Sequence, residues 1–159
     1  MIAEILGDKS VVVSLGRKSE SIGAAIRKEV GILAIKLVAH VKAGKLTGQV
    51  LKVQSGRLRR SITYKTYVSD SMIYALVGTN VIYAAIHEFG GKTKPHDIYP
   101  KKGKVLSWIA GNGEARFATV VHHPGSLMPP RSFLRSALVD MHDEIVDGLQ
   151  NAVNRGASK

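Results

Sequence analysis

Histidines beside carboxylates are the residues of this sequence that could carry metal or acid–base chemistry. His87 and Glu88 are adjacent, but a zinc-binding H-E-x-x-H helix needs a second histidine four residues after the first, and Gly91 stands there. His122 and His123 are also adjacent, so on a strand they point to opposite faces and cannot bind one ion together. Exposed or hydrogen-bonded histidines are the better interpretation. We therefore predict no metal site and no cofactor.

Nucleophilic chemistry finds no support in the residue types either. The chain has no cysteine, which excludes thiolate catalysis and iron–sulfur clusters and suits a reducing compartment. The segment Ser55–Ser61, SGRLRRS, resembles neither a Walker loop nor a nucleophile elbow. Its arginines around a glycine predict either a solvated basic loop or a contact for phosphate or carboxylate groups, and both interpretations stay open. We expect a protein that is not an enzyme.

The charge of the chain is high and unevenly distributed. Its 159 residues include 23 Lys and Arg but only 12 Asp and Glu, for a net charge of +11. A field of this sign favours polyanions or acidic protein surfaces. Residues 140–159 differ, because they hold two basic and four acidic side chains. Complementary patches on one chain would suit head-to-tail self-association, and a solvated acidic helix face is the simpler alternative.

The sequence pattern predicts which helices and strands position these residues. It indicates a single α+β domain over residues 1–159. A chain of this length buries enough surface for one core. Residues 2–15, rich in valine, indicate short strand-like pieces. Residues 19–42 indicate a long helix, because apolar residues recur there at steps of three and four. These residues are Ile22, Ile26, Val30, Leu33, Leu37 and Val41.

The second half of the pattern alternates strands and helices. Residues 62–68 and 72–77 predict one hairpin, and Tyr83, Ile86 and Phe89 have the spacing of a short helix that Gly90 and Gly91 end. The remaining expected elements are a hairpin of 104–110 and 115–122 around Asn112-Gly113, an ordered proline loop at 124–130 and a last helix at 131–153. Together they predict an antiparallel sheet of about four or five strands, packed by two long helices and one short helix.

The N-terminal sequence and the hydropathy pattern bear on localisation. No basic segment precedes an apolar run at Met1, and no stretch approaches the roughly 18 apolar residues that a bilayer span needs. We therefore expect a soluble, unprocessed protein with no membrane partner. Aromatic residues make up only 6% of the chain, so a stacking platform for single-stranded nucleic acid is not predicted.

Several short motifs follow one another along the chain, namely Leu46–Gly48, Val50–Val53, Ser55–Ile62, Val77–Asn80, Tyr83–Gly91, Ile98–Lys101 with Leu106, His123–Gly125 and Pro130–Leu134. Taken in order, they resemble the phage virion morphogenesis, or tail-completion, family. The resemblance is strongest over residues 46–138. Where the family often has a proline before a Phe-Leu pair, this chain has Ser132, and Pro129-Pro130 can compensate.

The resemblance implies a structural virion protein that completes the head-proximal end of the tail for head–tail joining. It implies a homo-oligomeric ring, hexameric in such proteins, located in the virion and assembled in the host cytoplasm. The expected partners are further copies, other tail and connector proteins, and the genomic DNA that passes through the ring. The candidate contact residues are Arg57, Arg59, Arg60, His87, Glu88, Phe89, Lys101, Lys102, Pro130, Arg131 and Phe133.

Two other functions stay open at this point. The net charge would also suit a sequence-independent nucleic-acid-binding protein, whose affinity should fall with salt as counterions are released. Scattered histidines are the only support for a metal-dependent nuclease.

Overall fold

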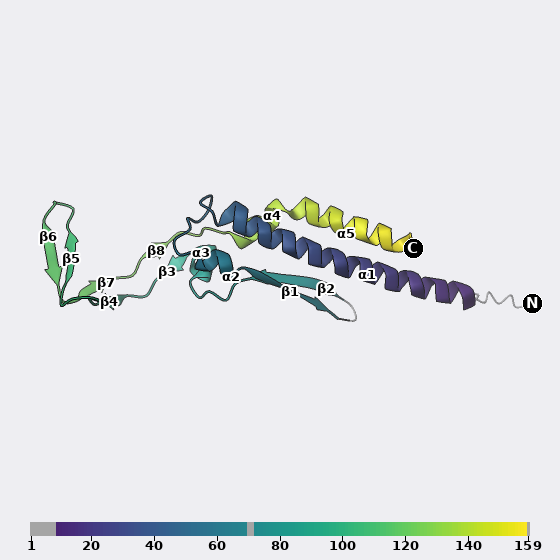
Figure 1. Ribbon diagram of the computed structural model, residues 1–159, viewed down its shortest axis with the longest axis horizontal. Coiled ribbons are helices and arrows are strands. Elements are labelled where there is room, and N and C mark those ends of the chain that lie inside the picture. Colours follow the sequence, from purple (N-terminus) through teal and green to yellow (C-terminus); the bar gives the residue numbers. More distant parts are fainter. Residues whose placement is uncertain (1–8, 70–71, 159) are drawn as a thin grey trace, which may run out of the picture. The chain divides into compact units, whose positions relative to one another are not determined.

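The computed structural model describes residues 9–69 and 72–158, which form two compact units (Figure 1). The helical unit comprises the described residues of Met1–Ala84 and Ser132–Lys159. The ribbon unit is Ala85–Arg131. Each unit is described by itself below. That the chain folds as one domain stays a prediction.

A long first helix organises the helical unit. Helix α1 (Lys9–His40) continues into a π-helical turn, η1 (Val41–Lys45). The predicted stripe from Ile22 to Val41 is buried or half-buried throughout, so the predicted helix is confirmed. The strand-like interpretation of residues 2–15 is wrong from Lys9 onward, where the chain is helical, and residues 2–8 lie outside the described part. Valine lowers helix propensity only slightly, and extending an existing helix costs far less than nucleating one.

The predicted first hairpin is confirmed. Strands β1 (Thr63–Val68) and β2 (Ile73–Gly78) pair antiparallel, from Thr63 opposite Gly78 to Val68 opposite Ile73. In β2 the half-buried side chains of residues 73, 75 and 77 alternate with exposed ones at 74 and 76. The half-buried face packs under α1 (Figure 1). The turn residues 70–71 lie outside the described part.

The predicted last helix is two helices. Helix α4 (Leu134–Asp140) and helix α5 (His142–Ala157) are interrupted at Met141, so the prediction of one helix over 131–153 is wrong at its start and in its continuity. Small residues let α5 approach α1 closely. A Cβ added at Gly156 would lie 2.5 Å from the Cα of Ile22, which leaves no room for any side chain.

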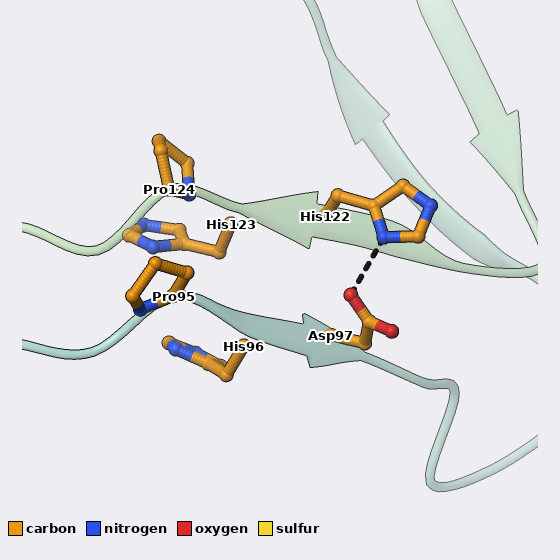
Figure 2. A pocket seen from close by; sticks show the side chains of 6 residues that line it. All are labelled: Pro95, His96, Asp97, His122, His123 and Pro124. Carbon is orange, nitrogen blue, oxygen red and sulfur yellow. Dashed lines mark hydrogen bonds and ion pairs between the residues drawn. The ribbon is translucent and has the colours of Figure 1, made fainter.

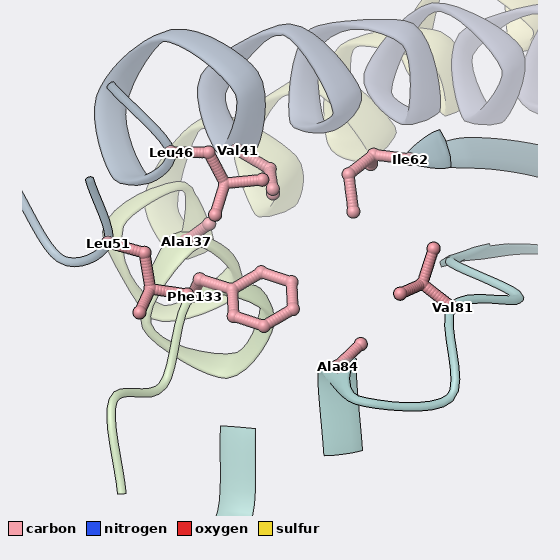
Figure 3. Packing of buried hydrophobic residues seen from close by; sticks show 8 residues of the cluster. All are labelled: Val41, Leu46, Leu51, Ile62, Val81, Ala84, Phe133 and Ala137. Atoms are coloured by element: carbon pink, nitrogen blue, oxygen red, sulfur yellow. The ribbon is translucent and has the colours of Figure 1, made fainter. Parts of the chain in front are cut away.

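The core of the helical unit lies where α1, α4 and the loop after η1 meet (Figure 3). The ring of Phe133 points into this core, and its side chain is fully buried. Eight buried residues form the cluster: Val41, Leu46, Leu51, Ile62, Val81, Ala84, Phe133 and Ala137.

The ribbon unit consists of short antiparallel ladders after helix α3 (Ala84–Phe89). Its three ladders are β3 (Gly91–Lys92) with β8 (Leu127–Met128), β4 (His96–Ile98) with β7 (Val121–His123), and β5 (Leu106–Ile109) with β6 (Ala115–Ala118).

The structure confirms the α+β class but not a single sheet. The described strands form four separate two-stranded sheets, so the predicted sheet of four or five strands is wrong. Proline, glycine and lysine in the connections stop each ladder after a few residues, because proline cannot donate to a ladder. The predicted second hairpin exists as β5 and β6, but the chain then leaves it to form β7 with β4. The predicted proline loop 124–130 contains strand β8.

Candidate interaction sites

Two motif segments that are far apart in the sequence meet in the ribbon unit. Strand β3 pairs Gly91 with Met128 of β8. Beside this ladder, the backbone N–H of Arg131 donates a hydrogen bond to the carbonyl oxygen of His87, with 2.7 Å between the heavy atoms. The structure therefore brings together two segments that hold five of the predicted contact positions, namely His87, Glu88 and Phe89 in one and Pro130 and Arg131 in the other.

Glycines permit this close approach. Gly90 has φ +72°, and a Cβ there would lie 2.9 Å from the backbone nitrogen of Pro130. Gly125 has φ +85°, and a Cβ there would lie 2.1 Å from the carbonyl oxygen of Thr93. A side chain at either position would meet backbone atoms and adopt a left-handed conformation that only glycine takes without strain. These two glycines of the recognised motifs are thus required by the fold of the ribbon unit.

The predicted contact residues lie in different environments. Glu88 is only 3% exposed and Phe133 is fully buried, so both side chains are covered by the chain itself. His87 is half-buried. Their role in subunit contacts stays a prediction, as it does for the exposed residues. The exposed ones are Arg57, Arg59, Arg60, Phe89, Lys101, Lys102, Pro130 and Arg131.

The arginines of the SGRLRRS segment lie on one short helix. Helix α2 (Arg57–Ser61) follows Gly56, which has φ +70°. The Nε of Arg59 donates a hydrogen bond to the carbonyl oxygen of Lys42 at 3.1 Å, which ties the helix to η1. Arg57 and Arg60 are both exposed residues. Such a turn can contact carboxylates or phosphates in either kind of partner.

Histidines line a hollow of about 480 Å³ between β4 and β7 (Figure 2). His122 and His123 point to opposite faces of the ladder, as predicted. The Nδ1 of His122 lies 2.6 Å from Oδ1 of Asp97, while the ring of His123 stacks on that of His96 with 5.0 Å between centroids. The His122 and Asp97 side chains are 79% and 42% exposed. Among the described residues, no three histidines or carboxylates are grouped to hold a metal ion.

Exposed apolar side chains on β5 and β6 are the feature that sequence reasoning missed. Ile109 is 75% exposed, Phe117 is 66% exposed and Trp108 is 42% exposed. Trp108 belongs to no buried cluster among the described residues. The Asn-Gly turn predicted this hairpin, but the sequence does not show whether another element lies against it. Large exposed apolar patches mark surfaces that bind other molecules.

The family comparison decides the class of the protein. The model of the phage virion morphogenesis family matches residues 34–153, which is well over half of the chain. The chain belongs to this family. The match runs from the end of α1 through the ribbon unit and into most of α5, and so extends on both sides of the region 46–138 in which the sequence motifs lie. Membership associates the protein with the phage virion.

The other comparisons add no relative. No curated protein and no solved structure matches the chain. Within the described residues, no helix combines the length and the apolar character that crossing a bilayer requires.

Proposed function

We propose that this member of the phage virion morphogenesis family is a structural, non-enzymatic protein that completes the head-proximal end of the tail. It works there as a homo-oligomeric ring, hexameric by the family resemblance, at which the head is joined. Its partners are further copies of itself, other tail and connector proteins, and the genomic DNA that passes through the ring.

One structural observation supports an assembly role most strongly. Among the described residues, every buried hydrophobic side chain belongs to the helical unit, and none lies in Ala85–Arg131. The ribbon unit consists of two-stranded ladders and a short helix, and an isolated two-stranded hairpin is marginally stable in water at best. A unit without its own core gains stability when another molecule covers its strands.

A ring of identical copies provides such contacts. Head-to-tail contacts between different surfaces of one chain form a ring when the rotation closes. The basic body and the acidic C-terminal segment give one chain two surfaces of opposite charge, which favours this kind of pairing.

Sequence-independent nucleic-acid binding is the second candidate, and the exposed arginines of α2 favour it. The salt dependence of DNA affinity tests this second candidate. Duplex DNA binding by the isolated protein should lose about 10³-fold or more in affinity between 50 and 200 mM salt if many phosphates are contacted. DNA affinity too weak to measure at 50 mM salt would remove this candidate. The nuclease hypothesis gains no support from the described residues.

Electron microscopy of particles assembled with and without the protein tests the proposal. Without the protein, filled heads and separate tails should accumulate, and adding the purified protein should join them. Joined particles in equal number without the protein would overturn the proposed function.

A further inference from the structure

We propose that the hairpin of β5 and β6 in one copy binds the outer face of α4 and α5 in a second copy. The two surfaces are the hairpin patch (Ser107, Ile109, Phe117 and the lysines before β5) and the acidic helix face (Val139, Asp143, Val146 and Asp147). This inference rests on the proposed ring and names the surfaces that would build it.

The hairpin patch is apolar at its centre. The register places Ser107 opposite Phe117 and Ile109 opposite Ala115, so these four residues share one face of the hairpin. Ile109 and Phe117 are three-quarters and two-thirds exposed. Among the described residues, no third strand pairs with this hairpin (Figure 1). All four residues of this face are exposed, so the face is open to a partner.

Basic residues precede the hairpin in the chain and are in excess in the ribbon unit. Lys101, Lys102 and Lys104 directly precede β5, and all three are exposed. Arg116 lies on the opposite face of β6, level with Trp108. In Ala85–Arg131 as a whole, basic residues outnumber acidic ones by seven to three. A partner that covers the apolar centre without repulsion should carry negative charge at its rim.

The acidic helix face has this composition. Helix α5 packs against α1 through the side that carries Gly148 and Gly156. On the other side, Val146 is 51% exposed between Asp143 and Asp147, whose side chains are also exposed. Val139, at the end of α4, is 73% exposed. Val139 and Val146 thus give this face exposed apolar surface with carboxylates beside it.

A second copy fits the hairpin patch better than nucleic acid does. Phosphate contacts use cationic and polar side chains, whereas the most exposed residues at the centre of the patch are Ile109 and Phe117. The complementary surface is present on the same chain. Each copy would use its hairpin patch on one neighbour and its acidic helix face on the other, which is the heterologous arrangement that a ring needs.

Engineered cysteines test the pairing directly, because the chain has none of its own. Ser107→Cys marks the hairpin patch and Val146→Cys marks the acidic helix face. Under mild oxidation, neither variant alone should form disulfide-linked dimers, their mixture should form a dimer, and the double variant should form a ladder of oligomers. The matched control is Gln54→Cys, exposed on the loop after η1, which should not cross-link with either variant.

Each other result overturns the inference. A disulfide dimer of Ser107→Cys alone would indicate a symmetric contact between hairpins. No dimer in the mixture, or equal cross-linking with the control, would show that these surfaces do not meet.

Charge reversal separates this inference from the proposed function. Lys102→Glu with Lys104→Glu, or Asp143→Lys with Asp147→Lys, should each abolish assembly measured by sedimentation velocity, and mixing the two double variants should restore it. If both variants assemble and join heads to tails as wild type does, the inference is overturned and the proposed function stands. If the Ser107→Cys and Val146→Cys variants cross-link as expected but heads join to tails without the protein, the proposed function is overturned and the interface stands.

Discussion

Phe133 is a single side chain whose removal should be felt by the whole helical unit. It is fully buried among the core residues in Figure 3. Truncating a buried phenylalanine costs about 3–5 kcal/mol, a large share of the stability of a small domain. Phe133→Ala should therefore lower the melting temperature sharply, as measured by circular dichroism. The matched control is Arg131→Ala, an exposed residue two positions earlier.

The control has its own expected result. Arg131→Ala should melt like wild type and weaken head–tail joining, because its guanidinium can reach a partner. A Phe133→Ala protein as stable as wild type, or full joining by Arg131→Ala, would contradict the corresponding half of this account.

Gly125 tests whether the ribbon unit needs its close backbone approach. The Thr93 amide donates to the carbonyl of Ser126 at 2.9 Å, next to the point where a Cβ on Gly125 would meet the carbonyl of Thr93. A left-handed conformation costs a residue other than glycine about 1–3 kcal/mol. Gly125→Ala should speed hydrogen exchange of the Thr93 amide by about fivefold or more. Gly111→Ala, at an open position without positive φ, should leave that exchange rate unchanged, and an equal rate in both variants would count against the contact.

Asp140 joins the end of α4 to α1 and η1. Its Oδ2 lies 2.6 Å from Nζ of Lys45 and 2.9 Å from Nε2 of His40. Hydrogen bonds from Lys45 first and His40 second lower the pKa of Asp140 below its ordinary 3.8. Because the folded-state pKa is depressed, the contribution to stability is present above pH 3.8 and is lost as the pH falls through the lower folded-state value.

This sign gives a pH-dependent prediction. Between pH 5 and pH 2, the urea midpoint of wild type should fall further than that of Asp140→Asn, which has lost the pair at every pH. Asp143→Asn, whose carboxylate pairs with the neighbouring His142 at 3.0 Å, should follow wild type. If the urea midpoints of wild type and Asp140→Asn fell equally with pH, the stabilising role of the Asp140 contacts with Lys45 and His40 would be contradicted.

At the scale of elements, the sequence could predict those helices and strands that are long enough to show a regular spacing of apolar residues. The stripe of α1 and the alternation of β1 and β2 repeat often enough to be recognised. The β3–β8 and β4–β7 ladders are two or three residues long, which is too short to show any period. The break at Met141 was hidden because the buried stripe continues from Ala137 through Met141 into α5.

At the scale of the whole molecule, the sequence predicted the α+β fold class and the family, but it did not predict that the ribbon unit lacks a hydrophobic core. Composition shows 45% hydrophobic residues, and nothing in it tells which of them the chain buries. Only the arrangement of elements shows that the buried hydrophobic residues among those described lie outside Ala85–Arg131. The sequence therefore predicted the charged residues and the glycine-containing motifs of the ribbon unit. It did not predict the exposed apolar surface of the β5–β6 hairpin.

The central claim is that copies of this chain cover one another's exposed hairpins in a ring at the head-proximal end of the tail. Cryo-electron microscopy of that end of assembled particles tests it most directly. The account predicts a closed ring in which residues 106–118 of every copy are buried against a neighbouring copy. Density that places the protein as single, separate copies, or hairpins that all remain in solvent, would contradict it.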